Sequence, residues 1–183
     1  VVISTSILGY AAKHVGIEQN TPPRGSAVNA DVQDAVEDLE TIAALIEELK
    51  NHGVPDRDTL NSMLKAVLRN NPNYLATWTC WEPNALDNQD YQFVNNNGHD
   101  ETGRFIPYWN RLDGQIDLAP LSDYDEQGKG DFYSVPLESG KATIFNPVEY
   151  KTKDGSLYKI VVTVPIHYDD QVAGVVGIDI PVK

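Results

Sequence analysis

The chain has 183 residues, of which 41% are hydrophobic and 22% are charged, a composition typical of one globular domain with a full core. The formal net charge is −13, so the basic surface that nucleic acid requires is absent, and nucleic-acid binding is excluded. A single cysteine, Cys80, excludes both an intrachain disulfide framework and a multi-cysteine zinc site.

Residues 1–27 form an N-terminal segment to which we assign no role. Residues 1–20 are expected to be loosely helical. Two consecutive prolines within Thr21–Gly25 remove backbone donors and interrupt that helix.

Residues 28–72 are expected to form a helical arm. Between Val28 and Lys50, apolar residues recur every three or four positions, which is the spacing of one helix face. A second helix is predicted from Arg57 to Asn70, because acidic residues lie near its start and an Asn-rich break follows it.

Residues 73–183 are expected to form an α+β module. Strands are predicted at Tyr74–Trp81, Lys141–Lys151, Leu157–His167 and Val172–Ile180, with a further short strand considered at Tyr91–Val94. Asp154 with Gly155, and Asp169 with Asp170, predict tight turns, so the last three strands should pair as antiparallel hairpins. We expect a meander that helices cover on one face.

The stretch Gly103–Tyr133 combines six aromatic residues and five aspartates with little helical or strand periodicity. Irregular segments held on a rigid scaffold often carry function. Aromatic faces attract ammonium groups and an acidic surface favours cations. We therefore expect Tyr108, Trp109 and nearby carboxylates to form one wall of a pocket for a small cationic ligand.

Asp179 is the first candidate for the floor of this pocket. Alternation along Val172–Ile180 places it on one strand face with Ala173, Val175 and Gly177, and the small residues Ala173 and Gly177 leave room above the sheet. A buried carboxylate needs a hydrogen-bonding or charged partner. Two interpretations stay open: Asp179 lines the pocket, or it caps a loop or pairs with a nearby lysine at the strand end.

Asp131 follows a Gly-Lys-Gly linker and is expected at or near the N-cap of a short helix. Capping alone would explain this position. It would still leave a second carboxylate oxygen free to accept a hydrogen bond from a ligand amine.

Catalytic and metal-binding signatures are lacking. The sequence contains no HExxH, GxSxG or GxxxxGK[ST] pattern, and its four histidines are scattered. Asp87, Asp90 and Asp100 resemble loose calcium ligands but do not have EF-hand spacing. We expect a binding domain that is not an enzyme and that holds neither a cofactor nor a metal.

Four motifs occur in order: EPNALD at Glu82–Asp87, GRFIPYWNR at Gly103–Arg111, DFY before a proline at Asp131–Pro136, and VPI with GVVGIDI within Val164–Ile180. Together they resemble the membrane-distal, PAS-like module of double Cache sensor domains. These modules lie outside the cytoplasmic membrane in bacterial chemoreceptors, sensor kinases and cyclases. The resemblance implies a long N-terminal helix, a central antiparallel sheet, and a small ligand held between the sheet and overlying helices and loops.

Within that family, the resemblance implies the branch that binds polyamines or biogenic amines. The amino-acid-binding branch carries an arginine two positions before a Trp-Tyr pair, whereas this chain has Gly130, Phe132 and Tyr133 there. The residues expected to contact the ligand are Trp81, Glu82, Tyr108, Trp109, Asp131, Tyr133, Tyr150 and Asp179.

The resemblance also implies the periplasmic or extracellular part of an inner-membrane receptor. Because the family continues into a membrane-proximal module, we expect either the distal module of a longer receptor or a single-module relative. The acidic helix Val28–Lys50 is compatible with a weak homodimer. Two alternatives remain: a ligand-free dimerisation or protein-interaction module, and a sensor for an amino acid, a purine or an organic acid.

Overall fold

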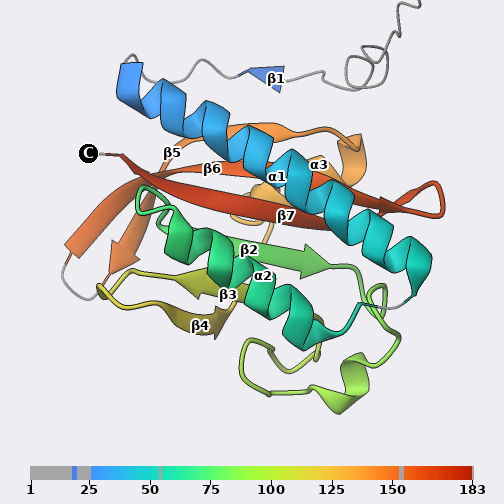
Figure 1. Cartoon of the computed structure of the whole chain (residues 1–183). Coiled ribbons are helices and arrows are strands. Elements are labelled where there is room, and N and C mark those ends of the chain that lie inside the picture. Colours follow the sequence, from blue (N-terminus) through green and yellow to red (C-terminus); the bar gives the residue numbers. More distant parts are fainter. Residues whose placement is uncertain (1–17, 20–25, 54, 153–154, 183) are drawn as a thin grey trace, which may run out of the picture.

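The centre of the molecule is a seven-stranded sheet with the order β1-β5-β6-β7-β2-β3-β4 (Figure 1). A computed structural model of the chain describes residues 18–19, 26–53, 55–152 and 155–182. All strand pairs are antiparallel except β1 with β5. The strands are β1 (Glu18–Gln19), β2 (Ala76–Trp81), β3 (Pro107–Asn110), β4 (Asp117–Pro120), β5 (Thr143–Thr152), β6 (Gly155–Tyr168) and β7 (Gln171–Val182). The architecture confirms the predicted α+β, PAS-like class.

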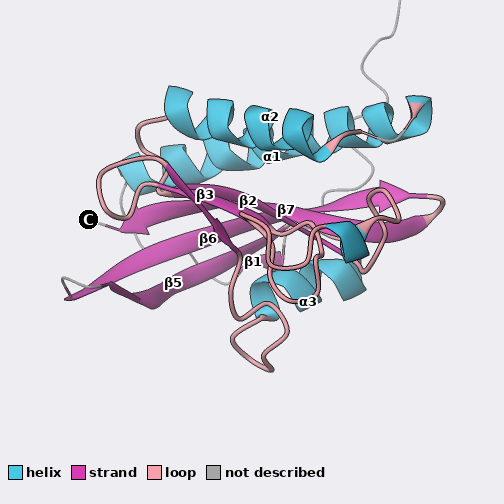
Figure 2. Cartoon of the chain, turned by 90° about the horizontal axis from the view of Figure 1, so that it is seen from below, coloured by secondary structure: helices cyan, strands magenta, loops and turns pink. Residues whose placement is uncertain are grey.

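Helices cover both faces of this sheet (Figure 2). The helices α1 (Ser26–His52) and α2 (Arg57–Asn70) lie on one face, and the short helix α3 (Asp131–Ser139) lies on the other. The predicted helical cover on one face is formed by α1 and α2, and α3 adds cover on the other face. The reason lies in β7, where eight consecutive residues, 173–180, are buried. A strand buried on both faces must be covered by other parts of the chain on both sides.

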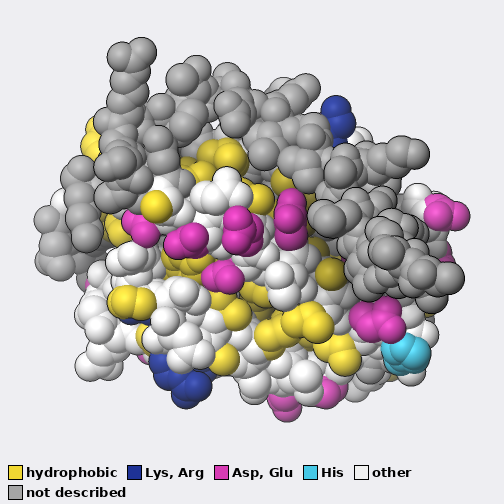
Figure 3. Space-filling model, turned by 45° about the horizontal axis from the view of Figure 1, so that its top comes forward, with side chains coloured by type: hydrophobic (Ala, Val, Ile, Leu, Met, Phe, Trp, Pro, Cys, Tyr) yellow, Lys and Arg dark blue, Asp and Glu magenta, His cyan; other side chains and the backbone are white. Residues whose placement is uncertain are grey.

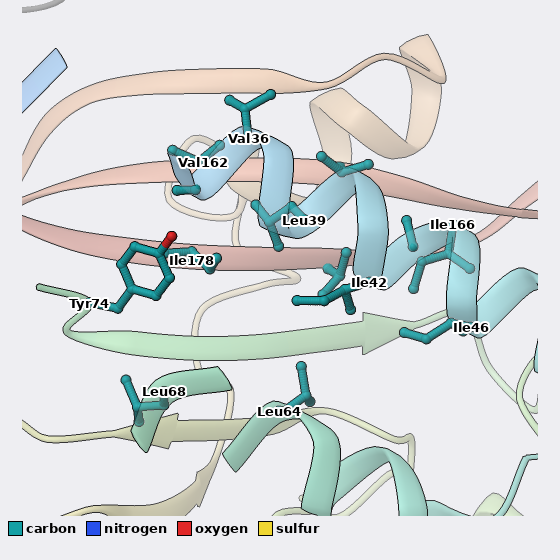
Figure 4. Close-up of a cluster of buried hydrophobic side chains, with 14 of the residues drawn as sticks. Val36, Leu39, Ile42, Ile46, Leu64, Leu68, Tyr74, Val162, Ile166 and Ile178 are labelled. Atoms are coloured by element: carbon teal, nitrogen blue, oxygen red, sulfur yellow. The ribbon is translucent and has the colours of Figure 1, made fainter. Parts of the chain in front are cut away.

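The helical layer and the sheet share one hydrophobic core (Figure 4). Residues 28–72, expected to form a helical arm, contain α1 and α2, and their regularly spaced apolar residues form the helix side of this core. The core side chains labelled in Figure 4 are Val36, Leu39, Ile42 and Ile46 of α1, Leu64 and Leu68 of α2, Tyr74, and Val162, Ile166 and Ile178 of the sheet. All are buried, so this layer fixes α1 against β6 and β7.

The hairpin between β6 and β7 turns at Asp169 and Asp170, as the sequence predicts. Both residues have positive φ values, 51° and 60°, the conformation of a two-residue turn that matches the twist of paired strands. The other predicted turn residue, Asp154, lies outside the described residues, and Gly155 begins β6.

Two local predictions differ from the structure. Residues 18–19 form a strand beside β5 rather than a loose helix, while the rest of 1–17 and 20–25 lies outside the described residues. The considered strand Tyr91–Val94 is replaced by a 3-10 helix at Asp90–Gln92. The chain curls here because the buried Asp90 carboxylate accepts hydrogen bonds from Arg57 and from the backbone N–H of Asn84.

The stretch Gly103–Tyr133 is more regular than predicted, because it contains β3, β4 and the start of α3. Each of the two strands has only four residues, which is too short for a two-residue period to stand out. Their pairing makes them strands, β3 with β2 and β4 with β3: Trp78 lies opposite Tyr108, and Tyr108 lies opposite Ala119.

The outer surface of α1 is acidic. Its exposed carboxylates belong to Asp34, Glu37, Glu40 and Glu48, and Figure 3 shows Asp and Glu side chains gathered on this side of the molecule. Leu45 and Leu49, which are 51% and 42% exposed, lie on the same helix. Among the described helices, none is both long and apolar enough to cross a membrane.

Truncation of Leu39 tests the shared core. Leu39 is fully buried, so Leu39→Ala is expected to lower the free energy of unfolding by about 2–5 kcal/mol through lost contacts and a cavity. Leu45→Ala, the same change at an exposed site on the same helix, should alter it by no more than about 0.5 kcal/mol. Urea unfolding measures both, and equal losses would show that α1 does not pack as described.

Candidate functional site

A cavity of about 550 Å³ opens on the sheet face opposite α1 and α2, between the sheet, the loop after β4 and α3. Its volume suits a small organic ligand. Its walls come from β2, β3, β5, β6 and β7, and from the second half of the stretch that was expected to form a wall. The lining residues that carry charge or an aromatic ring are Trp78, Tyr108, Asp123, Lys129, Asp131, Phe132, Phe145, Glu149, Tyr150, Lys159 and Asp179.

Asp179 lies at the floor of the cavity with no exposed surface. Its carboxylate accepts three hydrogen bonds: Oδ1 from Trp78 Nε1 at 2.9 Å, and Oδ2 from the Tyr108 hydroxyl at 2.9 Å and from Lys159 Nζ at 2.5 Å. The two interpretations left open by the sequence therefore both describe this residue. It lines the cavity, and it pairs with a lysine of the neighbouring strand.

Strand register brings these donors together. Asp179 lies opposite Val161 on β6 and opposite Ala76 on β2. Lys159 comes two residues before Val161, and Trp78 comes two residues after Ala76, so both lie on the same sheet face as Asp179. They are diagonal neighbours of Asp179, at a distance that long side chains can span. Tyr108 arrives from β3, where it lies opposite Trp78.

The room expected above Gly177 is occupied by the indole of Trp78. A Cβ atom at Gly177 would stand 2.1 Å from Trp78 Cζ2, so only glycine permits this approach. The edge of the indole also meets Phe132, with the ring centroids 5.3 Å apart. Ala173 belongs to the helix-side core instead, because the strand register shifts between Ile166 and His167.

Burial and the negative charge of Asp179 raise the pKa of Tyr108 well above its usual value. The Tyr108 hydroxyl is thus held as a donor to the carboxylate. Lys159 Nζ completes the site from above, 4.7 Å from the centre of the Tyr150 ring and 5.5 Å from that of Tyr108.

The mouth of the cavity is acidic. Asp131 is the first residue of α3, as predicted, and lies exposed at the rim, with Gly130 as the N-cap residue. Asp123 is a second exposed carboxylate in the lining. Glu149 borders the cavity through its strand, but it lies opposite Tyr158, so its side chain is on the sheet face opposite to Lys159. Lys129 also lines the rim, but its ammonium group contacts Glu126 at 2.6 Å.

Trp109 and Trp81, both expected at the ligand, lie on the opposite face of the sheet. Neighbouring residues of a strand point to opposite faces, so Trp109 is separated from Tyr108 and Trp81 from the face of Trp78. Trp109 Nε1 donates to Asn61 Oδ1 of α2 at 3.0 Å, and Trp81 belongs to the helix-side core. Neither residue lines the cavity.

Tyr133 and Glu82 come together, but away from this cavity. Successive helix residues diverge by about 100°, so α3 turns Phe132 toward Trp78 and Tyr133 toward Arg104. The Tyr133 hydroxyl donates to Glu82 Oε1 and accepts from Arg104 Nη2 at 2.8 Å. Of the eight residues expected at the ligand, the cavity lining includes Tyr108, Asp131, Tyr150 and Asp179.

Sequence reasoning missed Trp78, Phe132, Glu149 and Lys159. The signal for Lys159 was present, because a charged residue alternates with Val161 and Thr163 on one strand face. Only the register between β6 and β7 shows that this face meets Asp179.

The three carboxylates that resemble calcium ligands have other partners. Arg57 donates to Asp87 Oδ2 at 2.8 Å and to Asp90 Oδ1 at 2.6 Å. The side chains of Arg57, Asp87 and Asp90 are nearly inaccessible to solvent. Asp100 accepts from the Tyr124 hydroxyl at 2.7 Å. These contacts pin the loop after β2 to the start of α2.

A family model described as the first PDC sensor domain of methyl-accepting chemotaxis protein-like receptors matches residues 60–183. The chain belongs to this family. Methyl-accepting chemotaxis protein TlpQ of Pseudomonas aeruginosa is 31% identical over an alignment of 136 residues that covers 68% of this chain and 19% of that protein.

Solved structures of sensor domains are similar as well. The histidine kinase-type extracellular domain mmHK1S-Z3 superposes with a TM-score of 0.75 at 32% identity, over 85% of this chain and 54% of that one. Methyl-accepting chemotaxis protein X superposes with a TM-score of 0.68 at 25% identity, over 85% and 57%. The chain thus spans about half the length of these solved relatives. These likenesses confirm an extracytoplasmic sensor domain of the chemoreceptor and sensor-kinase type.

Alkaline pH is expected to weaken the floor of the cavity. The folded-state pKa of Tyr108 is raised above the unfolded value of about 10, so its contribution to stability is complete below about pH 10 and is lost as the pH rises further. Urea midpoints at about pH 8 and about pH 11 should differ more for wild type than for Tyr108→Phe. An equal loss in both proteins would contradict the assignment.

Proposed function

We propose that this domain senses a small cationic amine, bound in the cavity above Asp179 without chemical conversion. The observation that carries the proposal is the charge of the lining: the carboxylates of Asp123, Asp131 and Asp179 and two ammonium groups line a cavity with several aromatic walls. Carboxylates and aromatic faces are what a partly desolvated ammonium group requires.

The lining also argues against anionic ligands. None of the described residues that line the cavity is an arginine, which is the side chain best suited to clamp a carboxylate. Both cations are already engaged, Lys159 with Asp179 and Lys129 with Glu126. An amino acid or an organic acid would therefore find no free partner for its carboxylate, which favours an amine over those two ligand classes.

Signalling is proposed to pass through β6 and β7. These strands carry Lys159 and Asp179 on the cavity face and pack against α1 on the other face. In β7, Asp179 is preceded by Ile178, which lies in the core under α1 (Figure 4). A ligand that shifts the strands would thus bias the position of the long helix, which we propose leads toward the membrane.

A panel of amines, amino acids, purines and organic acids tests the proposal by thermal shift, because a ligand that binds the folded state raises its melting temperature. We expect amines such as putrescine and spermidine to stabilise the domain. Preferential stabilisation by carboxylates over amines would refute the amine assignment.

Asp131→Asn is expected to weaken amine binding by roughly 10- to 100-fold, the effect of losing a charge-assisted hydrogen bond. Glu138→Gln is the matched control, since this exposed acid lies on the same helix but outside the cavity. Isothermal titration with the amine found in the panel measures both. Equal affinities in the two variants would remove Asp131 from the site.

A weak homodimer through α1 is a second proposal, supported by the exposed pair Leu45 and Leu49 one turn apart. Leu45→Glu should abolish any rise in mass with concentration, because it places a charge among neighbouring acids. Tyr91→Glu, at an exposed aromatic away from α1, should have no such effect. Sedimentation equilibrium decides, and a wild type that stays monomeric throughout would end this proposal.

A further inference from the structure

All the hydrogen bonds that reach Asp179 come from the protein itself. Trp78, Tyr108 and Lys159 occupy both carboxylate oxygens, and the residue has no exposed surface. A ligand ammonium group can therefore contact this carboxylate only if one of the three donors leaves.

The three donors differ in their freedom to leave. Trp78 is 1% exposed and is held between Gly177 and Phe132, and Tyr108 is 6% exposed. The ammonium group of Lys159 is carried by a flexible four-carbon stem. The Lys159 side chain lines the cavity and is 12% exposed. Lys159 is thus the donor that a ligand would replace.

The surroundings of Lys159 Nζ are those of a bound amine. The nitrogen lies 2.5 Å from a buried carboxylate oxygen and within 6 Å of two tyrosine ring centres. The protein therefore places its own ammonium group, that of Lys159, in the subsite that the proposed function assigns to the ligand.

We propose that Lys159 is a tethered ammonium group that fills the subsite at Asp179 until an amine ligand exchanges with it. The inference rests on the proposed function. The exchange replaces one ammonium group by another, so the buried carboxylate is never left without a counter-charge. No proton moves. The released Lys159 turns toward the mouth, where Asp123 and Asp131 offer carboxylates.

Exchange also specifies the class of ligand. A monoamine that displaces Lys159 gains one ion pair and breaks an equivalent one, so it gains little. A diamine or polyamine carries a further ammonium group, which can reach the carboxylates of Asp123 or Asp131 at the mouth. The domain should therefore select amines with two or more charges over monoamines of the same length.

The first test removes the tether. Lys159→Ala should melt at a lower temperature than wild type, and n-propylammonium, which has the carbons and nitrogen that the substitution removes, should restore stability. Neither n-propanol nor propionate should do so, and wild type and the exposed control Lys141→Ala should not respond to n-propylammonium. No recovery of Lys159→Ala by n-propylammonium would overturn the subsite.

The second test uses Lys159→Met, which keeps most of the side-chain volume and so guards against misfolding. Titration with 1,4-diaminobutane should show binding at least about tenfold tighter than to wild type, since no internal cation competes. Equal or weaker binding by Lys159→Met would overturn the exchange while leaving the amine function intact. Absence of binding by both proteins would instead refute the amine function.

Discussion

The buried carboxylate of Asp179 is the constraint on which the cavity depends. A charge without solvent must be surrounded by donors, and the fold supplies them from three other strands: Trp78 from β2, Tyr108 from β3 and Lys159 from β6. Meeting that requirement brings two aromatic rings and a cation to one point of the sheet. The cavity is the space left above this cluster, closed on its far side by α3 and the loop before it.

The same strands face two ways. Val176, Ile178 and Ile180 of β7 build the core under α1, while Asp179 of the same strand lines the cavity. The cavity and the long helix are thus separated by one layer of backbone. A second buried cluster, in which Arg57 binds Asp87 and Asp90, fixes the loop after β2 to α2. Two of the three acids that resemble metal ligands, Asp87 and Asp90, are therefore parts of this structural ion cluster.

Sequence periodicity predicted the elements that are long and half-buried. The helices α1 and α2 and the strands β2, β5, β6 and β7 follow from three- to four-residue or two-residue spacing, and the α+β class follows from their order. The short strands β3 and β4 were missed, because their pairing, β3 with β2 and β4 with β3, makes them strands and their own pattern does not. The 3-10 helix at Asp90–Gln92 was missed because a distant arginine, Arg57, holds it in place.

For the site, the sequence by itself determined that Asp179 lies in a small-residue strand face, that Asp131 starts a helix, and that Tyr108 and Tyr150 are nearby candidates. It also determined the family, through the order of its motifs. Only the tertiary structure decided which rings face the cavity. Alternation sends Trp109 and Trp81 to the helix side, and the helical turn sends Tyr133 to Arg104. The tertiary structure alone revealed that Lys159 forms an ion pair with Asp179. That contact depends on the register between β6 and β7, which no local sequence pattern encodes.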